Sequence, residues 1–272
     1  MKFSVVIMNP PYQDANNKRS PLWQKFVKKA MELVKENGFV AAIHPCSWRK
    51  PDHELFDMFK SKKLKYLEIH NQQDGIKTFD CGTRYDWYIL QNSKGSNKTV
   101  IVDENGIQKE IDISKRFFIP HAHSEVLEKC LAKNEEEKYE IIHSFSMYEN
   151  RSPWISKTKS AKYKYPCVYA TPCNKEPNLL YSCKKDGHFG IKKVIIGKAS
   201  PENAFYDENG EYGVTNNCFG IRVDNKVQAM GIIKALSSDK FKEIIEACKW
   251  AGFAMEYKTF HYFKKDFWKE FI

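Results

Sequence analysis

The sequence predicts an α/β protein, in which part of a doubly wound sheet is followed by a second domain of mixed α+β structure. In the first hundred residues, β-branched runs alternate with helical patterns, which is typical of mostly parallel strands with helices on both faces. After about residue 150, short strand-like pieces lie among prolines, aromatics and lysines. We therefore expect a sheet domain over residues 1–120, a linker or helix over 121–150 and a second domain over 151–272.

The first expected strand is the β-branched run over residues 3–8, which is apolar enough to be buried and ends at two prolines. A helix follows, with Ser20 as its N-cap, Pro21 at the first helical position and Gly38 beyond its end. Its apolar residues recur with the helical period, and its lysines take the other side. These signals predict an amphipathic helix packed on the sheet.

The remaining elements are predicted from the same patterns. Asp52 is expected to cap a short helix, and Asn105-Gly106 to form the turn of a hairpin. The other expected strands lie over residues 39–43, 64–69, 87–90, 194–197 and 217–223, and the other expected helices over 125–133, 226–236 and 239–249.

Composition and charge narrow the class of protein. The formal net charge is +10, of which residues 1–150 contribute +2 and residues 151–272 contribute +8, so the second part is expected to meet a polyanion. The chain has neither an apolar run long enough for a membrane span nor a signal peptide, so we expect a cytoplasmic protein, or one in a nucleoid or viral factory. The cysteines lack the spacing of a zinc site, and we expect no metal.

One tetrapeptide, Asn9-Pro10-Pro11-Tyr12, directly follows the first expected strand. It arises by chance in on the order of one chain in a thousand of this size. Active sites of open α/β sheets lie beyond the carboxyl ends of strands, which is where this tetrapeptide falls. We therefore expect it to be a catalytic site.

The residue types suit an exocyclic amine of a nucleobase. Such a nitrogen is a poor nucleophile because its lone pair is spread into the ring. Two acceptors, the Asn9 side-chain oxygen and the Pro10 carbonyl, can accept hydrogen bonds from both N–H groups and so localise the lone pair on the nitrogen. The prolines fix the backbone, so the acceptors are placed before the substrate arrives. Tyr12 offers a flat face on which an extruded base can stack.

The tetrapeptide is similar to motif IV of the amino-methyltransferases, and its surroundings resemble the gamma-class adenine-N6 DNA methyltransferases of restriction–modification systems. This resemblance implies a Rossmann-like methyltransferase sheet, S-adenosylmethionine as methyl donor and double-stranded DNA as substrate. In that family a loop phenylalanine packs on the flipped base, and the best match here is Phe79, ahead of the strand-like residues 85–90. The stretch over residues 194–250 resembles target-recognition domains of such enzymes.

The sequence also departs from that family. The family's donor-binding strands and glycine-rich turn precede the tetrapeptide, whereas this sequence starts at the tetrapeptide's own strand and has no acidic-x-Gly-x-Gly turn. We therefore expect it to lack the S-adenosylmethionine-binding half, so that either a second polypeptide completes the enzyme or the chain is a retired one. Alternatives are a non-catalytic DNA-binding or specificity subunit and, less favoured, an RNA guanine or protein glutamine methyltransferase, since the same signature serves those enzymes.

Basic residues of the second part are the candidates for contacts with DNA. Residues 250–268 interleave aromatics with lysines, as nucleic-acid contacts require, but an ordinary core covered by lysine stems gives the same pattern. The candidates are Lys192, Lys193, Arg222, Lys249, Lys258, Lys264 and Lys265.

Overall fold

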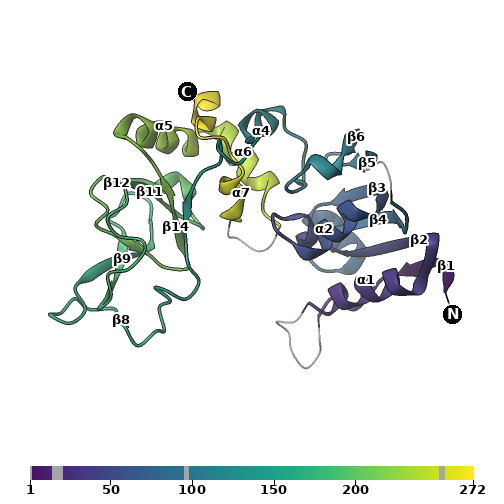
Figure 1. Ribbon diagram of the computed structural model, residues 1–272, viewed down its shortest axis with the longest axis horizontal. Coiled ribbons are helices and arrows are strands. Elements are labelled where there is room, and N and C mark those ends of the chain that lie inside the picture. The colour runs from purple at the N-terminus through teal and green to yellow at the C-terminus, as the bar shows by residue number, and fades with distance from the viewer. Residues whose placement is uncertain (1, 14–20, 95–97, 251–254) are drawn as a thin grey trace. The chain divides into compact units, whose positions relative to one another are not determined.

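The structure is a computed structural model that describes residues 2–13, 21–94, 98–250 and 255–272. The chain forms two compact units (Figure 1). Unit 1 comprises the residues up to His123 together with Trp250–Gly252, and unit 2 comprises Ser124–Lys249 and Phe253–Ile272. Most of the stretch 121–150, expected as a linker or helix, therefore falls in the second unit, which begins at Ser124.

Unit 1 is built on a six-stranded sheet with the strand order β1-β2-β4-β3-β5-β6. The pairs β1–β2 and β3–β5 are parallel, and the other three pairs are antiparallel. The α/β class is confirmed, but the expectation of a mostly parallel sheet is wrong, because β4 returns between β2 and β3 in the opposite direction. The strands are Phe3–Met8 (β1), Val34–Pro45 (β2), Lys63–His70 (β3), Tyr85–Gln91 (β4), Lys98–Val102 (β5) and Gln108–Asp112 (β6).

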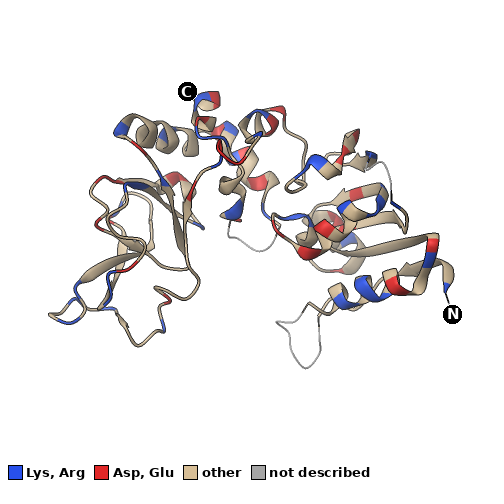
Figure 2. Ribbon diagram, viewed as in Figure 1, with Lys and Arg blue, Asp and Glu red and all other residues tan. Residues whose placement is uncertain are grey.

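The helices of unit 1 pack on this sheet. The predicted helix after the first strand is present as α1, with Pro21 at its N-cap position, while Ser20 lies outside the described residues. It ends at Leu33, earlier than expected, because the residues from Val34 on, including Gly38, belong to β2. The helix buries Trp23, Val27 and Ala30 in the core and leaves its lysines exposed. Figure 2 marks the positions of these lysines along α1 in blue. The helices are Leu22–Leu33 (α1), Cys46–Arg49 (η1), Glu54–Ser61 (α2), Gln72–Phe79 (α3) and Ile113–Lys115 (η2).

The cap of α2 differs from the prediction. Asp52 adopts a left-handed backbone conformation with φ of 56°, and the next residue, His53, accepts the Leu55 N–H at 3.2 Å. The imidazole nitrogen replaces the expected carboxylate as cap. Burial lowers the pKa of His53 to about 4, so the ring is neutral and able to accept this bond near neutral pH.

A buried ion pair ties η1 to β4. Nε of Arg49 donates to Oδ2 of Asp86 at 2.8 Å, and both side chains are completely buried. The indole of Trp48 donates to the same carboxylate oxygen, and Arg49 also donates to the carbonyls of Ile119 and Pro120. This network holds the connection after β2 against the start of β4, next to the edge of the sheet described below.

The expectation that the first strand is buried on both faces is wrong. Val6 and Met8 pack against the core, but Val5 and Ile7, on the opposite face, are 51% and 80% exposed. In the part of the chain that the structure describes, β1 pairs only with β2. One face and one edge of this apolar strand are therefore uncovered.

Unit 2 combines two four-stranded sheets with helices. Their strand orders are β13-β9-β10-β8 and β12-β11-β14-β7. The predicted helix over residues 226–236 is present with those bounds as α5, and the next, α6, ends at Ala247 instead of Lys249. The strands are Ile141–Ile142 (β7), Ile155–Ser156 (β8), Tyr165–Ala170 (β9), Asn178–Ser182 (β10), Lys193–Gly197 (β11), Phe205–Asp207 (β12), Gly213–Val214 (β13) and Cys218–Arg222 (β14), and the helices Glu125–Cys130 (α4), Pro201–Asn203 (η3), Lys226–Leu236 (α5), Asp239–Ala247 (α6), Lys258–His261 (α7) and Phe267–Phe271 (η4).

Candidate active site at the end of the first strand

Several strands of unit 1 bring their ends to one edge of the sheet. Asn9 follows β1, and Pro45 and His70, the last residues of β2 and β3, both pair with Tyr85, the first residue of β4. Because β4 runs opposite to its neighbours, its beginning meets their ends. The expected placement of Asn9-Pro10-Pro11-Tyr12 at the carboxyl end of the strands is what the structure shows.

The four residues of the tetrapeptide have different surroundings. Pro10 is buried and Pro11 is exposed, so the first proline anchors the turn in the protein. The Asn9 side chain is exposed and makes no hydrogen bond with any other described residue. A rigid turn that holds an unbonded amide at a strand end is suited to bind an external donor group.

Tyr12 is half-buried and packs against the core of unit 1. Burial, together with the nearby Tyr85, raises the pKa of Tyr12 to about 12, so the phenol is neutral at physiological pH. Its hydroxyl is buried and has no hydrogen-bond partner among the described residues. Buried hydroxyls are usually bonded, so this one is available to a ligand.

The ring of Phe79 lies beside that of Tyr12. The ring centroids are 6.0 Å apart and the planes meet at 74°, while Phe79 also meets Tyr85 edge-on at 5.0 Å. The sequence predicted Phe79 in a loop, but Phe79 is the last residue of helix α3. Since the rings of Tyr12 and Phe79 are nearly perpendicular, they do not form two parallel plates around one base in this conformation.

Helix α3 is fixed at both ends, and this fixes Phe79. A reciprocal capping box between Asn71 and Asp74 begins the helix. At Gly75 a Cβ atom would lie 2.1 Å from the Thr83 carbonyl oxygen, so only glycine permits the close approach of α3 to the segment before β4. Near its end, the Thr78 hydroxyl lies 3.1 Å from that of Tyr85.

Cys46 follows Pro45 near the same edge, and a Pro-Cys pair supplies the nucleophile in cytosine-C5 methyltransferases. Here the thiol is buried and donates to the Trp250 carbonyl at 3.3 Å. Burial raises the pKa of Cys46 to about 12. A thiol that is protonated and enclosed in this way is unsuited to nucleophilic attack.

Unit 1 by itself does not fit S-adenosylmethionine. The glycines among its described residues are Gly38, Gly75, Gly82 and Gly106, and none lies in a turn between a strand and the helix that follows it. A nucleotide-like donor needs such a turn, because only there can backbone N–H groups approach it closely.

Lys193 cannot be a DNA contact in this structure, which corrects the expectation from the sequence. Its side chain is fully buried, and Nζ donates to Asp207 at 2.6 Å and to the Ile191 carbonyl at 3.2 Å. Asp207 in turn accepts the backbone N–H groups of Glu211 and Tyr212. Lys193 therefore anchors a loop inside unit 2.

The other basic candidates are at or near the surface of unit 2, but several are paired with acids. Arg222 binds Glu140 at 2.9 Å, and Lys249 binds Glu246. Lys192 and Lys265 are exposed, whereas Lys258 is partly buried. Among the described residues of the stretch 250–268, the phenylalanines Phe260, Phe263 and Phe267 are at most 1% exposed, so these three rings belong to the core of unit 2.

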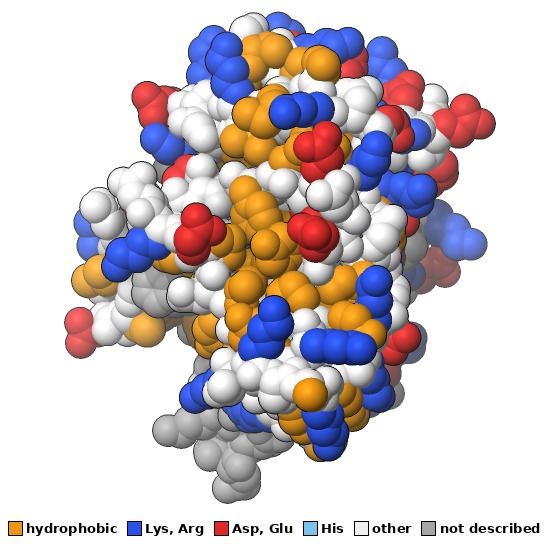
Figure 3. Space-filling view, turned by 90° about the vertical axis from the view of Figure 1, so that its left-hand side faces the viewer, with side chains coloured by type: hydrophobic (Ala, Val, Ile, Leu, Met, Phe, Trp, Pro, Cys, Tyr) orange, Lys and Arg blue, Asp and Glu red, His pale blue; other side chains and the backbone are white. Residues whose placement is uncertain are grey.

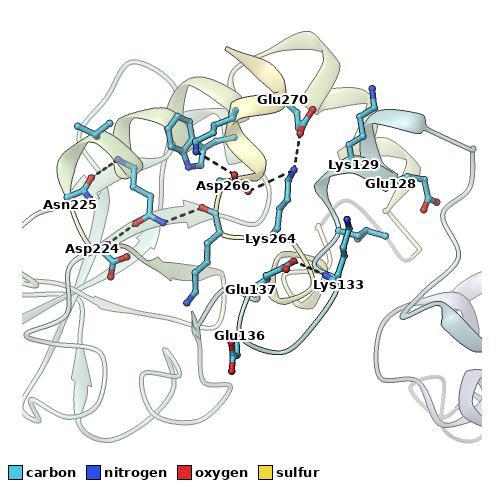
Figure 4. Close-up of a pocket in the computed structure, with 16 residues that line it drawn as sticks. Glu128, Lys129, Lys133, Glu136, Glu137, Asp224, Asn225, Lys264, Asp266 and Glu270 are labelled. Atoms are coloured by element: carbon cyan, nitrogen blue, oxygen red, sulfur yellow. Dashed lines mark hydrogen bonds and ion pairs between the residues drawn. The ribbon is translucent and has the colours of Figure 1, made fainter.

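Lys264 and Lys265 line a large open cavity of unit 2, about 1140 Å³ in volume (Figure 4). Lys264 binds Glu270 at 2.9 Å and Asp266 at 3.9 Å. The five lysines of the cavity wall face six acids, so the wall has a formal charge of −1 and offers little attraction to DNA. Its charged residues are Lys129, Lys133, Lys264, Lys265, Lys269, Glu128, Glu136, Glu137, Asp224, Asp266 and Glu270.

A different set of lysines escaped the sequence reasoning. No Asp or Glu occurs over residues 150–175, which contain six basic residues interleaved with aromatics. This absence of acids in the sequence could have indicated the basic segment. It extends over a long stretch, however, and coincides with no recognised motif. Among the described residues, no cluster of three or more His, Cys, Asp or Glu side chains is arranged to hold a metal ion.

At this edge of the sheet, the Asn9 amide and the Pro10 carbonyl directly follow a strand, and the rings of Tyr12 and Phe79 meet each other. Residues 1–79 match the family Eco57I restriction-modification methylase. This match confirms, over that segment, the resemblance to restriction–modification methylases. The helices described by the structure include none with the length and apolar character needed to cross a membrane.

Individual proteins are similar to parts of the chain. An "Uncharacterized adenine-specific methylase" of Mycoplasma pneumoniae is 32% identical over 131 residues, which cover 43% of this chain and 30% of that protein. The type IIL restriction-modification enzyme MmeI, solved in complex with DNA, aligns with a TM-score of 0.45 and 8% identity over 85% of this chain and 42% of its own. The EcoKI M protein of a type I restriction enzyme aligns with a TM-score of 0.30 and 14% identity over 37% and 25%. The chain thus spans under a third of the curated relative's length.

Proposed function

We propose that the chain carries the catalytic and DNA-reading parts of an adenine-N6 DNA methyltransferase of restriction–modification type. The exposed Asn9 amide, which follows β1 and has no hydrogen-bond partner among the described residues, is the observation that carries this proposal. The match of residues 1–79 to a restriction-modification methylase family supports it.

In the proposed mechanism, the residues of unit 1 prepare the amine for attack. The Asn9 side-chain oxygen and the Pro10 carbonyl oxygen each accept a hydrogen bond from one N–H group of the adenine amino group. This arrangement draws the nitrogen lone pair out of the ring system and directs it away from the protein. The anchoring of Pro10 keeps the acceptors in place, so little reorganisation is needed during reaction.

Tyr12 and Phe79 have unequal proposed roles. The face of Tyr12 receives the extruded base, since stacking of a base on an aromatic ring contributes about 1–3 kcal/mol. Phe79, which meets Tyr12 edge-on, supports that ring and closes the side of the site. The buried hydroxyl of Tyr12 remains protonated and can donate a hydrogen bond to the substrate.

The methyl donor, which we propose is S-adenosylmethionine, needs a further polypeptide segment. We propose that this segment, bearing a strand and a glycine-rich turn, pairs with the free edge of β1 and covers Val5 and Ile7. An apolar strand with an open edge and a bare face is a template for such pairing. The donor site would then lie beside Asn9, which follows the same strand.

Product analysis tests the proposal. The chain is combined with the donor-binding polypeptide, duplex DNA and labelled S-adenosylmethionine, and the digested DNA is examined by mass spectrometry. We expect N6-methyladenine. Label in guanine of added RNA or in a protein glutamine would replace this proposal with one of the alternatives, and no transfer to any substrate would identify a DNA-binding or specificity subunit.

A further inference from the structure

Unit 2 carries a surface of lysines that are not neutralised by acids. These lysines, within residues 157–185, are all exposed, and no ion pair forms between them and any described acid, whereas Arg151 lies 3.9 Å from Glu149. We call this set the β8–β10 basic surface, and it consists of Lys157, Lys159, Lys162, Lys164, Lys184 and Lys185.

The fold brings these lysines together from two parts of the sequence. Ser156 of β8 pairs with Tyr181 of β10, and Ser182 of β10 pairs with Tyr165 of β9. The loop between β8 and β9 therefore lies beside the end of β10. Tyr163, within this loop, donates its hydroxyl to the Pro153 carbonyl at 3.0 Å, which folds the loop back on its origin.

Aromatic rings hold several of the ammonium groups in place. Lys184 lies 3.9 Å from the ring centre of Trp154. Lys164, just before β9, and Lys185, after β10, both lie over Tyr165, at 5.2 and 5.9 Å. Cation–π contacts of this kind orient lysines without cancelling their charge, unlike ion pairs. Figure 2 shows the basic segments near β8, and Figure 3 shows lysines and arginines around apolar side chains on this side of the molecule.

A cavity of about 690 Å³ lies on the same sheet. Its polar side chains come from Asn150, Arg151, Lys157, Tyr169 and Asn178, and no carboxylate lines it. Asparagine and arginine are the side chains that form paired hydrogen bonds with the edges of adenine and guanine. A basic wall with amides and a guanidinium is chemically suited to bases in a groove, with lysines placed for the flanking phosphates.

We propose that the β8–β10 basic surface and this cavity form the face of unit 2 that binds duplex DNA, with lysines on phosphates and Asn150, Arg151 and Asn178 toward base edges. The proposal deepens the proposed function, from which it takes DNA as the polyanion. It assigns DNA recognition to residues 150–185, a segment that contains none of the basic candidates selected from the sequence. The cavity of Figure 4, with its wall charge of −1, is excluded from this face.

Salt-dependent binding tests the surface. The whole chain is titrated with a labelled mixed-sequence duplex at several salt concentrations. Each phosphate contact contributes about 0.9 to the slope of log affinity against log salt. We expect the triple variant Lys159→Gln, Lys162→Gln, Lys164→Gln to lower that slope by roughly 2–3. The matched variant Lys129→Gln, Lys133→Gln, Lys265→Gln removes the same charge from the other cavity and should leave the slope unchanged.

An equal decrease of the salt slope in the two triple variants would overturn the proposal, since the net charge of the protein alone would then explain DNA binding. Tighter binding to a single-stranded RNA of equal length would overturn it as well. The Asn9→Ala variant is titrated in parallel. It separates DNA binding by the β8–β10 basic surface from the proposed methylation, since Asn9 lies in unit 1 and is not part of that surface. A lysine-dependent slope in a protein that never methylates DNA would leave this surface assigned and remove the enzymatic function, whereas methylation without dependence on these lysines would do the reverse.

Discussion

The ring of Phe79 meets the ring of Tyr12 edge-on, at a centroid distance of 6.0 Å and an interplanar angle of 74°. Phe79 ends helix α3 and Tyr12 follows β1, so two distant segments meet at the edge of the sheet. In the proposed base site, Tyr12 presents the face of its ring to the base and Phe79 lies perpendicular to it. We therefore predict unequal effects of replacing the two aromatic residues.

Replacing Tyr12 by Ala should weaken the capture of an extruded base by about 5- to 150-fold, the equivalent of a stacking contribution of about 1–3 kcal/mol. Phe79→Ala should have a smaller effect, because its ring presents an edge. Fluorescence of 2-aminopurine at the target position reports extrusion. Tyr12→Phe keeps the ring and removes only the hydroxyl, so it separates the stacking contribution from that of the hydrogen bond. A larger loss in Phe79→Ala than in Tyr12→Ala would contradict the assigned roles.

The uncovered face of β1 predicts a surface-specific effect. Ile7→Lys should leave the urea stability of the chain nearly unchanged, since Ile7 is 80% exposed, but it should prevent the donor-binding polypeptide from restoring methylation. Val227→Lys, which changes an equally apolar residue with 73% exposure in unit 2, is the matched control. Restoration that is as efficient with Ile7→Lys as with the control would remove β1 from the interface.

Lys193 predicts a loss of stability without a loss of charge recognition. Lys193→Met leaves Asp207 buried without its partner, and breaking a buried pair in this way costs about 3–5 kcal/mol. We expect a lower urea midpoint for unit 2. The salt slope of DNA binding by the variant, measured under conditions where it is folded, should match that of the wild type. A slope lowered by about 0.9 would return Lys193 to the DNA contacts.

Buried histidines predict sensitivity to acid. Burial lowers the pKa of His44 to about 3 and that of His188 to about 4, both below the unfolded value of 6.5. Between those limits the unfolded chain binds more protons, so stability is full above about pH 6.5 and falls as the pH drops toward 4. Each such group contributes a slope of up to about 1.4 kcal/mol per pH unit.

The variant His188→Asn tests this dependence in unit 2, because the Asn oxygen can still accept the Val214 N–H that Nδ1 of His188 accepts at 3.2 Å. Urea unfolding of unit 2 between pH 4 and 7 should show a flatter pH dependence in the variant. Parallel curves for the two proteins would show that His188 does not contribute to acid sensitivity.

The features that local sequence predicted are those that neighbouring residues determine. The tetrapeptide from Asn9 to Tyr12 is contiguous, and the helix over residues 226–236 has its own cap and periodicity. The insertion of β4 between β2 and β3 depends on pairing between distant segments, so the mixed sheet was not foreseen. The burial of Lys193 depends on Asp207, which lies on the neighbouring strand, and a lysine alone gives no sign of such a partner.

The site shows the same limit. The stacking of Phe79 on a flipped base stays a prediction, and the close approach of Gly75 to Thr83, which helps to hold helix α3, is not revealed by any pattern in the sequence. The basic loop was overlooked because its lysines become one surface only when β8 and β10 pair.

The central claim is tested most directly by Asn9→Ala in a methylation assay that contains duplex DNA, S-adenosylmethionine and the donor-binding polypeptide. Loss of a preorganised polar group at a reacting centre typically lowers kcat by about 100- to 1000-fold. We predict a loss of this size with DNA affinity within about twofold of the wild type, while Asn209→Ala, at an exposed position of unit 2, retains full activity. Undiminished formation of N6-methyladenine by Asn9→Ala would contradict the account.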